Sequence, residues 1–181
     1  MMRWILWTLA GLLLGGIVHL ATVLALPRTA TQDAYARLAP LTPVNAVTPL
    51  PPPTPGNAVL PFMDPAFAVA ICRYDLGSGP IKLAAPVSQA YTSVTFYTRR
   101  GVAYYGINDR AAGRRSIELD LMTTAQHDAM PEEADVTAAD RLIIESPSAT
   151  GLIVLRALSP EPGLMPMAQA ALAAARCQVA Q

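Results

Sequence analysis

Charge of either sign is scarce in this chain, and its scarcity excludes a first class of function. The 181 residues carry 13 basic and 13 acidic side chains, so the formal net charge at pH 7 is zero. No excess of positive charge is available to neutralise phosphates, and nucleic-acid binding is therefore not expected. Charged residues make up 14% of the chain and hydrophobic residues 52%, a bias to which one membrane segment and many alanines contribute. The length fits one domain with appendages.

Residues that carry chemistry are also few. His127 is the one histidine outside the apolar amino-terminal run, and no spacing of His, Cys, Asp and Glu brings several metal ligands together. The sequence has neither a GxSxG nor a CxxC motif. We therefore predict no metal, no cofactor and no catalytic residue. The missing motifs argue against an enzyme but leave that question open.

The two cysteines, Cys72 and Cys177, allow one disulfide. It would close a loop of about 100 residues, which stabilises a fold by about 4 kcal/mol in the chain-entropy model. Disulfides form mainly outside the cytoplasm, so the bond is expected only if the folded part lies there. Two free thiols are the alternative.

Long apolar runs are absent except at the amino terminus. Residues 4–26 contain no Asp, Glu, Lys or Arg, and about 20 helical residues suffice to cross a bilayer. Arg3, within residues 1–3, favours a cytoplasmic start and a body on the outer side. We predict a single-pass signal anchor in the lipid bilayer of a bacterial inner membrane, with a periplasmic body. A cleaved signal peptide is the alternative, but its apolar region usually has about 7–15 residues.

Two small residues lie in this run. Gly11 and Gly15 fit the pattern that lets membrane helices approach closely, and they could make the protein a homodimer. Simple tolerance of glycine in a membrane helix is the other interpretation.

Residues 27–65 are predicted to be a short helix followed by a tether. The helix would begin after Thr31, with Tyr35 and Leu38 on one side. Proline is frequent between residues 40 and 65, which favours an extended, semi-rigid spacer. Residues 52–55 also meet the bare PxxP pattern of a recognition motif, although a spacer is the simpler interpretation.

Residues 66–181 are predicted to form the body, because apolar and polar residues alternate there with a period of two. We expect seven strands, over residues 66–76, 81–84, 93–97, 102–107, 117–121, 142–145 and 152–158. A turn at residues 99–101 would join one hairpin, and residues 147–151 another. The pattern predicts a mainly β fold, an antiparallel β-sandwich or jelly-roll-like domain. A brief helix is expected over residues 123–130. A closing helix is expected over residues 166–176, with Cys177 at its end.

Aromatic side chains suggest a binding surface. The tyrosines Tyr91, Tyr97, Tyr104 and Tyr105 lie on neighbouring predicted strands, and such a cluster could bind a partner or an apolar ligand. Arg156 is a candidate for the same surface. The alternative is that these tyrosines are the outer half of a packed sheet.

Several short runs resemble the bacterial family catalogued as domain of unknown function 1254. They are Arg73-Tyr74-Asp75-Leu76, Gly79-Pro80, Tyr91-Thr92-Ser93-Val94, Leu142-Ile143-Ile144-Glu145 and Leu155-Arg156. The anchor is similar to that of the family's short, single-span members. Larger members join this domain to a second, β-rich domain of unknown function 1214. The resemblance therefore implies that a separate small membrane protein supplies the second domain. It carries no established reaction.

Together these observations favour a membrane-anchored, envelope-facing protein that acts as a binding or scaffolding module in an envelope complex. The alternative is a small-ligand carrier or enzyme with a pocket between the sheets, lined by Tyr91, Tyr104 or Arg156. A convergent polar cluster in an apolar cavity would favour that alternative.

Overall fold

The structure, a computed structural model, describes residues 1–29, 33–112, 115–130 and 142–180. The chain divides into two compact units, Met1–Gln32 and Asp33–Gln181. In the first unit, α1 (Met2–Thr29) is a single apolar helix. Within the described residues it supplies the one stretch, Met2–Leu26, that is long and apolar enough to cross a membrane, with a mean hydropathy of 2.2.

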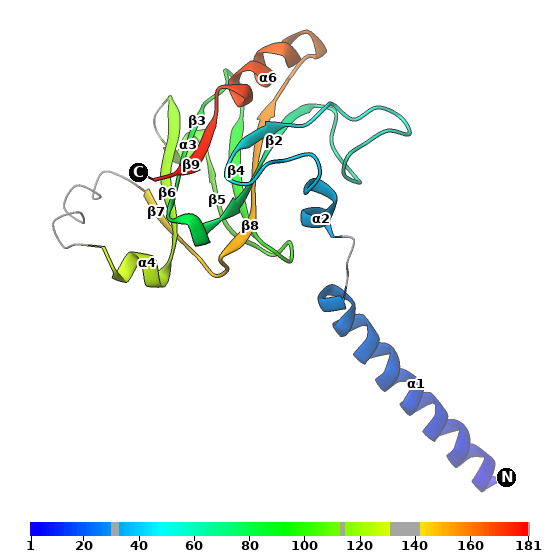
Figure 1. Ribbon diagram of the computed structural model, residues 1–181. Coiled ribbons are helices and arrows are strands. Elements are labelled where there is room, and N and C mark those ends of the chain that lie inside the picture. Colours follow the sequence, from blue (N-terminus) through cyan, green and yellow to red (C-terminus); the bar gives the residue numbers. More distant parts are fainter. Residues whose placement is uncertain (30–32, 113–114, 131–141, 181) are drawn as a thin grey trace. The chain divides into compact units, whose positions relative to one another are not determined.

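The second unit is a sandwich of two sheets, as Figure 1 shows. The first sheet has the order β1-β2-β8-β4-β5 and the second β7-β6-β3-β9. The strands of the five-stranded sheet are β1 (Val47–Pro49), β2 (Phe67–Asp75), β8 (Thr150–Leu158), β4 (Thr92–Thr98) and β5 (Ala103–Asn108). Those of the four-stranded sheet are β7 (Leu142–Ser146), β6 (Ser116–Thr123), β3 (Ile81–Pro86) and β9 (Arg176–Val179). The prediction of a mainly β, sandwich-like body is confirmed.

Short helices connect these strands. They are α2 (Ala34–Leu38), α3 (Asp109–Ala112), α4 (Thr124–Asp128) and α6 (Met165–Ala173), with 3-10 turns η1 (Leu76–Ser78) and η2 (Pro162–Leu164). The predicted brief helix is α4, which begins with a capping box between Thr123 and Gln126. The predicted closing helix is α6, which packs on β2 and β8 through the buried Ala168 and Leu172.

The main core lies between the inner faces of the two sheets. In β3 every second side chain is buried, as expected for a strand with one face in the core. The inner face of β2 is built mostly from small residues, Ala68, Ala70 and Cys72. Larger side chains, such as Phe96 and Leu155, fill the core from β4 and β8.

A second, smaller core lies on the outer face of the five-stranded sheet. Leu38 and Leu50 are buried there with Ile71 and Leu152. The predicted extended, semi-rigid spacer over residues 40–65 therefore does not hold at Leu50, which packs into this core. Proline does not prevent it, because the apolar residues between the prolines gain more from burial than from staying in water.

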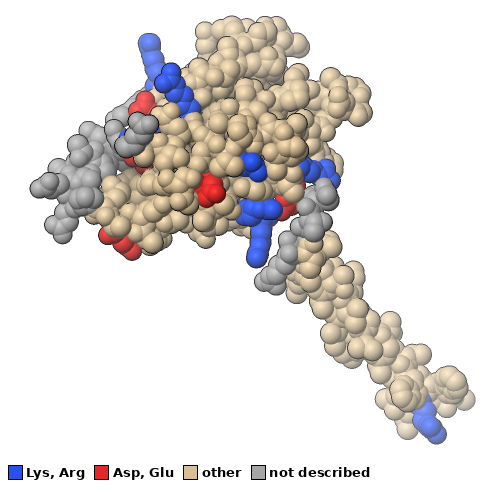
Figure 2. Space-filling model, in the orientation of Figure 1, with Lys and Arg blue, Asp and Glu red and all other residues tan. Residues whose placement is uncertain are grey.

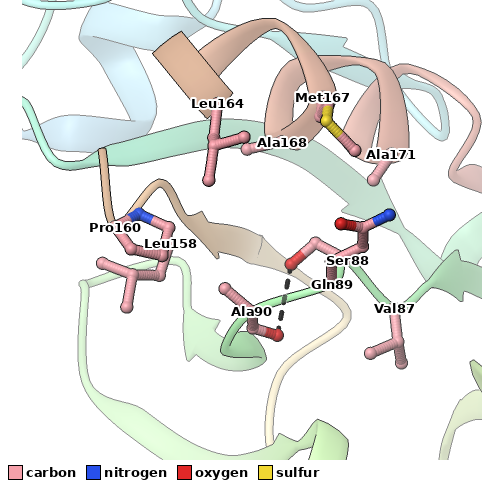
Figure 3. A pocket seen from close by; sticks show the side chains of 10 residues that line it. All are labelled: Val87, Ser88, Gln89, Ala90, Leu158, Pro160, Leu164, Met167, Ala168 and Ala171. Atoms are coloured by element: carbon pink, nitrogen blue, oxygen red, sulfur yellow. Dashed lines mark hydrogen bonds between the residues drawn. The ribbon is translucent and has the colours of Figure 1, made fainter. Parts of the chain in front are cut away.

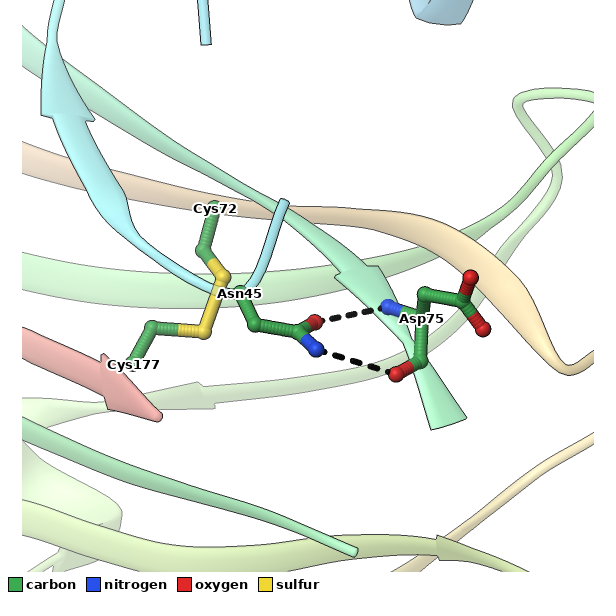
Figure 4. Close-up of a disulfide and its surroundings, with 4 residues drawn as sticks. All are labelled: Asn45, Cys72, Asp75 and Cys177. Carbon is green, nitrogen blue, oxygen red and sulfur yellow. Dashed lines mark hydrogen bonds between the residues drawn. A yellow bond between two sulfur atoms is a disulfide. The ribbon is translucent and has the colours of Figure 1, made fainter. Parts of the chain in front are cut away.

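Asn45 fastens the same segment to the end of β2. Its backbone is left-handed, with φ of 58°. Its side chain accepts from the Asp75 amide at 2.8 Å and donates to the Asp75 carbonyl at 3.1 Å, as Figure 4 shows. The chain then continues into β1, whose Val47 pairs with Cys72.

Two further predictions need correction. Residues 142–145 and 152–158 were expected to form a hairpin, but β7 and β8 belong to different sheets. β7 instead runs parallel to β6, so the second sheet is mixed. The closing helix ends at Ala173, and Cys177 lies in β9 rather than at a helix end. The hairpin at residues 99–101 is present as β4–β5.

Candidate functional site

The predicted tyrosine surface does not exist as one surface. Tyr104 and Tyr105 pack against the main core, with ring centroids 6.2 Å and 5.9 Å from that of Phe96. Tyr97 packs against the smaller outer core. Tyr91 is exposed on the outer side, away from these three. A bulge between Phe96 and Tyr97 shifts the register of β5, which the alternation of residues in the sequence does not reveal.

Tyr74 is instead the centre of a buried hydroxyl cluster, which no pattern in the sequence predicts. Its hydroxyl lies 3.2 Å from that of Tyr104 and 3.0 Å from that of Ser146, and it donates to the Tyr97 carbonyl at 3.3 Å. Burial raises the pKa of Tyr104 well above its usual value, against the opposing hydrogen bond of Ser146. The cluster is therefore neutral and serves to satisfy buried polar groups.

The absence of a side chain at Gly151 leaves room for the Tyr74 hydroxyl in this cluster. A Cβ atom at this position would lie 2.2 Å from the Tyr97 carbonyl oxygen and 2.3 Å from the Tyr74 hydroxyl. Only glycine fits there, and the close approach of backbone and phenol depends on it.

Tyr91 and Arg156, in contrast, line one hollow on the outer face of the five-stranded sheet. The hollow has a volume of about 400 Å³. Its floor comes from β4 and β5, and the rings of Phe67 and Tyr91 border it. Arg156 lies on the central strand, with its guanidinium 5.9 Å from the centre of the Phe67 ring. The predicted pocket between the sheets is thus replaced, for these two residues, by a hollow outside them.

A second outer hollow adjoins the first at Arg156. Its volume is about 230 Å³. Apolar side chains from the smaller core and from the loop at residues 60–63 dominate its walls. Phe62 in this loop is fully exposed and has a left-handed φ of 59°.

A third opening, a cleft of about 320 Å³, lies beside α6 (Figure 3). Leu164, Met167 and Ala171 form one wall, and residues 87–90 form the opposite wall. Leu164 and Met167 are both exposed large hydrophobic residues. The lining is mostly apolar, which suits an apolar side chain of a partner.

The wall opposite α6 is held in place by hydrogen bonds. The Ser88 hydroxyl and amide lie 2.8 Å and 2.9 Å from the Thr92 hydroxyl, and Thr92 is fully buried at the start of β4. The α6 wall instead offers Met167, whose flexible side chain adapts to different surfaces. The cleft therefore has one fixed and one adaptable side.

The two cysteines are bonded to each other. The Cys72–Cys177 disulfide joins β2 of one sheet to β9 of the other, with Cα atoms 6.4 Å apart (Figure 4). Both residues are buried in the main core. The bond is structural in this position, since neither sulfur is accessible to a substrate.

Segment 33–38 is attached to the sheet by an aromatic–cation stack. The guanidinium groups of Arg99 and Arg73 lie 4.1 Å and 5.2 Å from the centre of the Tyr35 ring. Arg99 also pairs with Asp33 at 2.5 Å. These contacts occupy basic groups that would otherwise offer an anion site.

The described residues hold no group of three or more His, Cys, Asp or Glu side chains that could bind a metal ion. His127 pairs with Glu145 at 2.9 Å on the surface. Hydrogen bonds, first from Thr124 and then from His127, lower the pKa of Glu145. The Thr124 hydroxyl donates to Glu145 at 2.9 Å, and among the described residues no hydroxyl or thiol is hydrogen-bonded to the His127 ring, as a nucleophile activated by this histidine would be.

Charged groups are sparse over the face of the body seen in Figure 2. Gly11 and Gly15 lie in α1, where a Cβ atom would meet nothing within 4 Å. Either glycine could therefore be replaced without a clash inside the helix.

Comparisons with known proteins show the family of the body but do not show a function. Residues 44–179 match the family model of DUF1254, described as a protein of unknown function. No curated protein matches the sequence. The crystal structure of the VPA0106 protein from Vibrio parahaemolyticus is similar to 81% of this chain, with a TM-score of 0.58 and 11% identity, over 34% of its own length.

An uncharacterized protein from Burkholderia cenocepacia is similar over 70% of this chain and 34% of its own, with a TM-score of 0.48 and 14% identity. This chain thus spans about a third of the length of both solved structures. At such low identity the likeness to the Vibrio protein concerns the fold alone.

Proposed function

This chain belongs to the DUF1254 family of proteins of unknown function, and from that premise we propose that it is a membrane-anchored binding module of an envelope complex. α1 holds the module in a bacterial inner membrane, with the amino terminus in the cytoplasm and the body in the periplasm. The apolar length of Met2–Leu26 supports the anchor, and the leading Arg3 supports the orientation. A Cys72–Cys177 disulfide suits an oxidising compartment.

The observation that carries a binding role is the cleft beside α6. Isolated exposed hydrophobic residues are normal on a soluble surface, but Leu164 and Met167 together border a concave, mostly apolar opening. Such an opening buries an inserted apolar side chain well, and interfaces are strongest where an anchor fills a pocket. The polar atoms of Ser88 and Gln89 at the opposite wall can orient what enters.

The partner we propose is a small membrane protein that carries the complementary domain of unknown function 1214. The Vibrio structure is about three times longer than the region that it shares with this chain, so a body of this fold occurs there within a larger chain. A separate partner would restore such an arrangement by association. The cleft beside α6 is the contact surface we assign to it.

Site-specific photo-crosslinking in the native host tests this function. A photoreactive amino acid at Met167 is compared with one at Glu118, an exposed position on β6 of the other sheet. Position 167 should yield one crosslinked small membrane protein bearing the 1214-type domain, and position 118 should yield none. Crosslinks of equal yield at both positions, or none at position 167, would contradict the proposal.

A further inference from the structure

The outer face of the five-stranded sheet holds a row of hydrogen-bond donors that meet no acceptor among the described residues. Ser93 of β4 is paired with Arg156 of β8 on one side and with Asn108 of β5 on the other. Directly opposed residues in adjacent antiparallel strands have their Cβ atoms about 5 Å apart on the same face. The three side chains therefore stand in line across three neighbouring strands, and all three line the larger outer hollow.

Each member of this row can still donate. In the described part of the chain Arg156 forms no salt bridge, and its guanidinium lies 5.9 Å from the centre of the Phe67 ring. The Asn108 side-chain oxygen accepts from the Ala111 amide at 2.9 Å, which turns its NH₂ group to other partners. The hydroxyl of Ser93 has no side-chain hydrogen bond within the described residues. Guanidinium, amide and hydroxyl donors in one row form a site for an anion.

Next to this row the same face becomes apolar. Moving along the strands from Arg156, the next outward residues are Val154 and Leu152 of β8, which pair with Ile71 and Arg73 of β2. Val154, Leu152 and Ile71 line the smaller outer hollow, and the loop at residues 60–63 contributes to its walls. Arg156 lines both hollows. The anion site thus adjoins a mostly apolar hollow.

We propose that this trough binds a long-chain carboxylate, that is, a fatty acid. Its carboxylate would pair with Arg156 and accept from Ser93 and Asn108, and its hydrocarbon chain would lie over Val69 and Val154 beside residues 60–63. Among the described residues that line the two hollows, Arg156 is the one cation, which matches a single negative charge. A planar guanidinium binds a carboxylate through two parallel hydrogen bonds. A neutral ester lacks that charge and a short acid lacks the chain, so both should bind less well.

Photo-crosslinking with a palmitate that carries a diazirine in mid-chain tests this assignment. The full-length protein in an uncharged detergent is labelled, and the labelled peptides are mapped by mass spectrometry. We expect label on residues 59–63 and on the 69–71 and 152–154 segments. Arg156→Gln should reduce this body labelling about tenfold or more, since a charged hydrogen bond is removed. Arg176→Gln, an equal charge change on β9 of the other sheet, should leave it unchanged.

Three internal comparisons keep the result decisive. Labelling of α1 by probe dissolved in the micelle should be equal in all variants. Unlabelled oleate should compete at least about tenfold better than methyl oleate, because only oleate is charged. Arg156→Lys should retain part of the labelling, which would show that a loss in Arg156→Gln is not a loss of folding.

Three outcomes would overturn the proposal: label confined to residues 2–29, equal labelling of Arg156→Gln and the natural chain, or equal competition by oleate and its methyl ester. Tighter binding of a lysophosphatidylglycerol than of oleate would overturn the choice of a carboxylate.

Discussion

The inner face of the five-stranded sheet is packed against the four-stranded sheet and bonded to it through Cys72–Cys177. The outer face of the same sheet is covered only in part, by α2 and by residues between it and β2. The inner face carries apolar residues and a satisfied hydroxyl cluster. The outer face carries Arg156 on its central strand, beside Ser93 and Asn108. One sheet thus has a closed inner face and a partly open outer face, and the proposed ligand site lies on the outer one.

Removal of the disulfide on the inner face should lower the free energy of unfolding the most. Replacing both Cys72 and Cys177 by alanine should lower the free energy of unfolding by about 4 kcal/mol, because the unfolded chain regains the freedom of a loop of roughly 100 residues. Urea denaturation of the full-length protein in detergent, with and without reductant, measures this. An unchanged midpoint in reductant, with thiols verified by intact mass, would show that the bond adds no stability.

Matched leucine truncations compare the two cores directly. Leu155 and Leu38 are both fully buried, the first in the main core and the second in the outer one. We expect Leu155→Ala to cost about 4 kcal/mol and Leu38→Ala about 2 kcal/mol, since the outer segment can close over the space while two packed sheets cannot. Urea midpoints of the two variants decide this. A larger cost for Leu38→Ala would reverse the ranking of the faces.

Two tyrosine-to-phenylalanine substitutions compare the contribution of a hydroxyl group to stability on the two faces. Tyr74→Phe removes the partner shared by Tyr104 and Ser146 inside the core, and we expect a loss of about 1–2 kcal/mol. Tyr91→Phe on the outer face should cost nothing measurable, because Tyr91 is 40% exposed. Thermal unfolding of both variants provides the measurement. Equal melting temperatures of Tyr74→Phe and Tyr91→Phe would show that the hydroxyl cluster does not contribute to stability.

The smallest effect concerns the surface pair His127–Glu145. Since Thr124 and His127 lower the pKa of Glu145 below its ordinary 4.5, the ionised carboxylate is favoured in the folded state. Its contribution to stability is present above the ordinary pKa and is lost as pH falls through the lower folded value. His127→Ala should raise the pKa of Glu145, and Thr124→Val should raise it more, which NMR titration of the side-chain carboxyl can follow. An unchanged titration in both variants would exclude these hydrogen bonds as the cause.

The alternation of residues was enough to predict the sandwich, because one buried face per strand is a local property. It placed the strands at residues 93–97 and 117–121 within those now called β4 and β6. It could not predict which strands pair. Pro147 and Gly151 signal a turn, yet β7 joins β6 and β8 joins β2 and β4, a choice made by contacts distant in the sequence.

The candidate sites were harder to foresee for related reasons. The bulge in β5 turns Tyr104 toward the core, and no pattern in the sequence predicts this bulge. Arg156 was expected at a binding surface, but its donor neighbours Ser93 and Asn108 become visible only when the strands are in register. Proline content suggested a spacer over residues 40–65, where Leu50 in fact helps to complete a core, since composition does not reveal which apolar residues find a partner.

The position of Cys177 also fixes an order of events during biogenesis. Its partner Cys72 is synthesised 105 residues earlier, and β2 must wait for β8 as well, because Phe67 pairs with Leu158. Non-local pairings of this kind form late and slowly. With only two cysteines in the chain, no incorrect bond can form within one molecule while it waits. Formation of the disulfide therefore reports that the last strand, β9, has docked. The rate at which the bond forms can be used to follow the completion of folding.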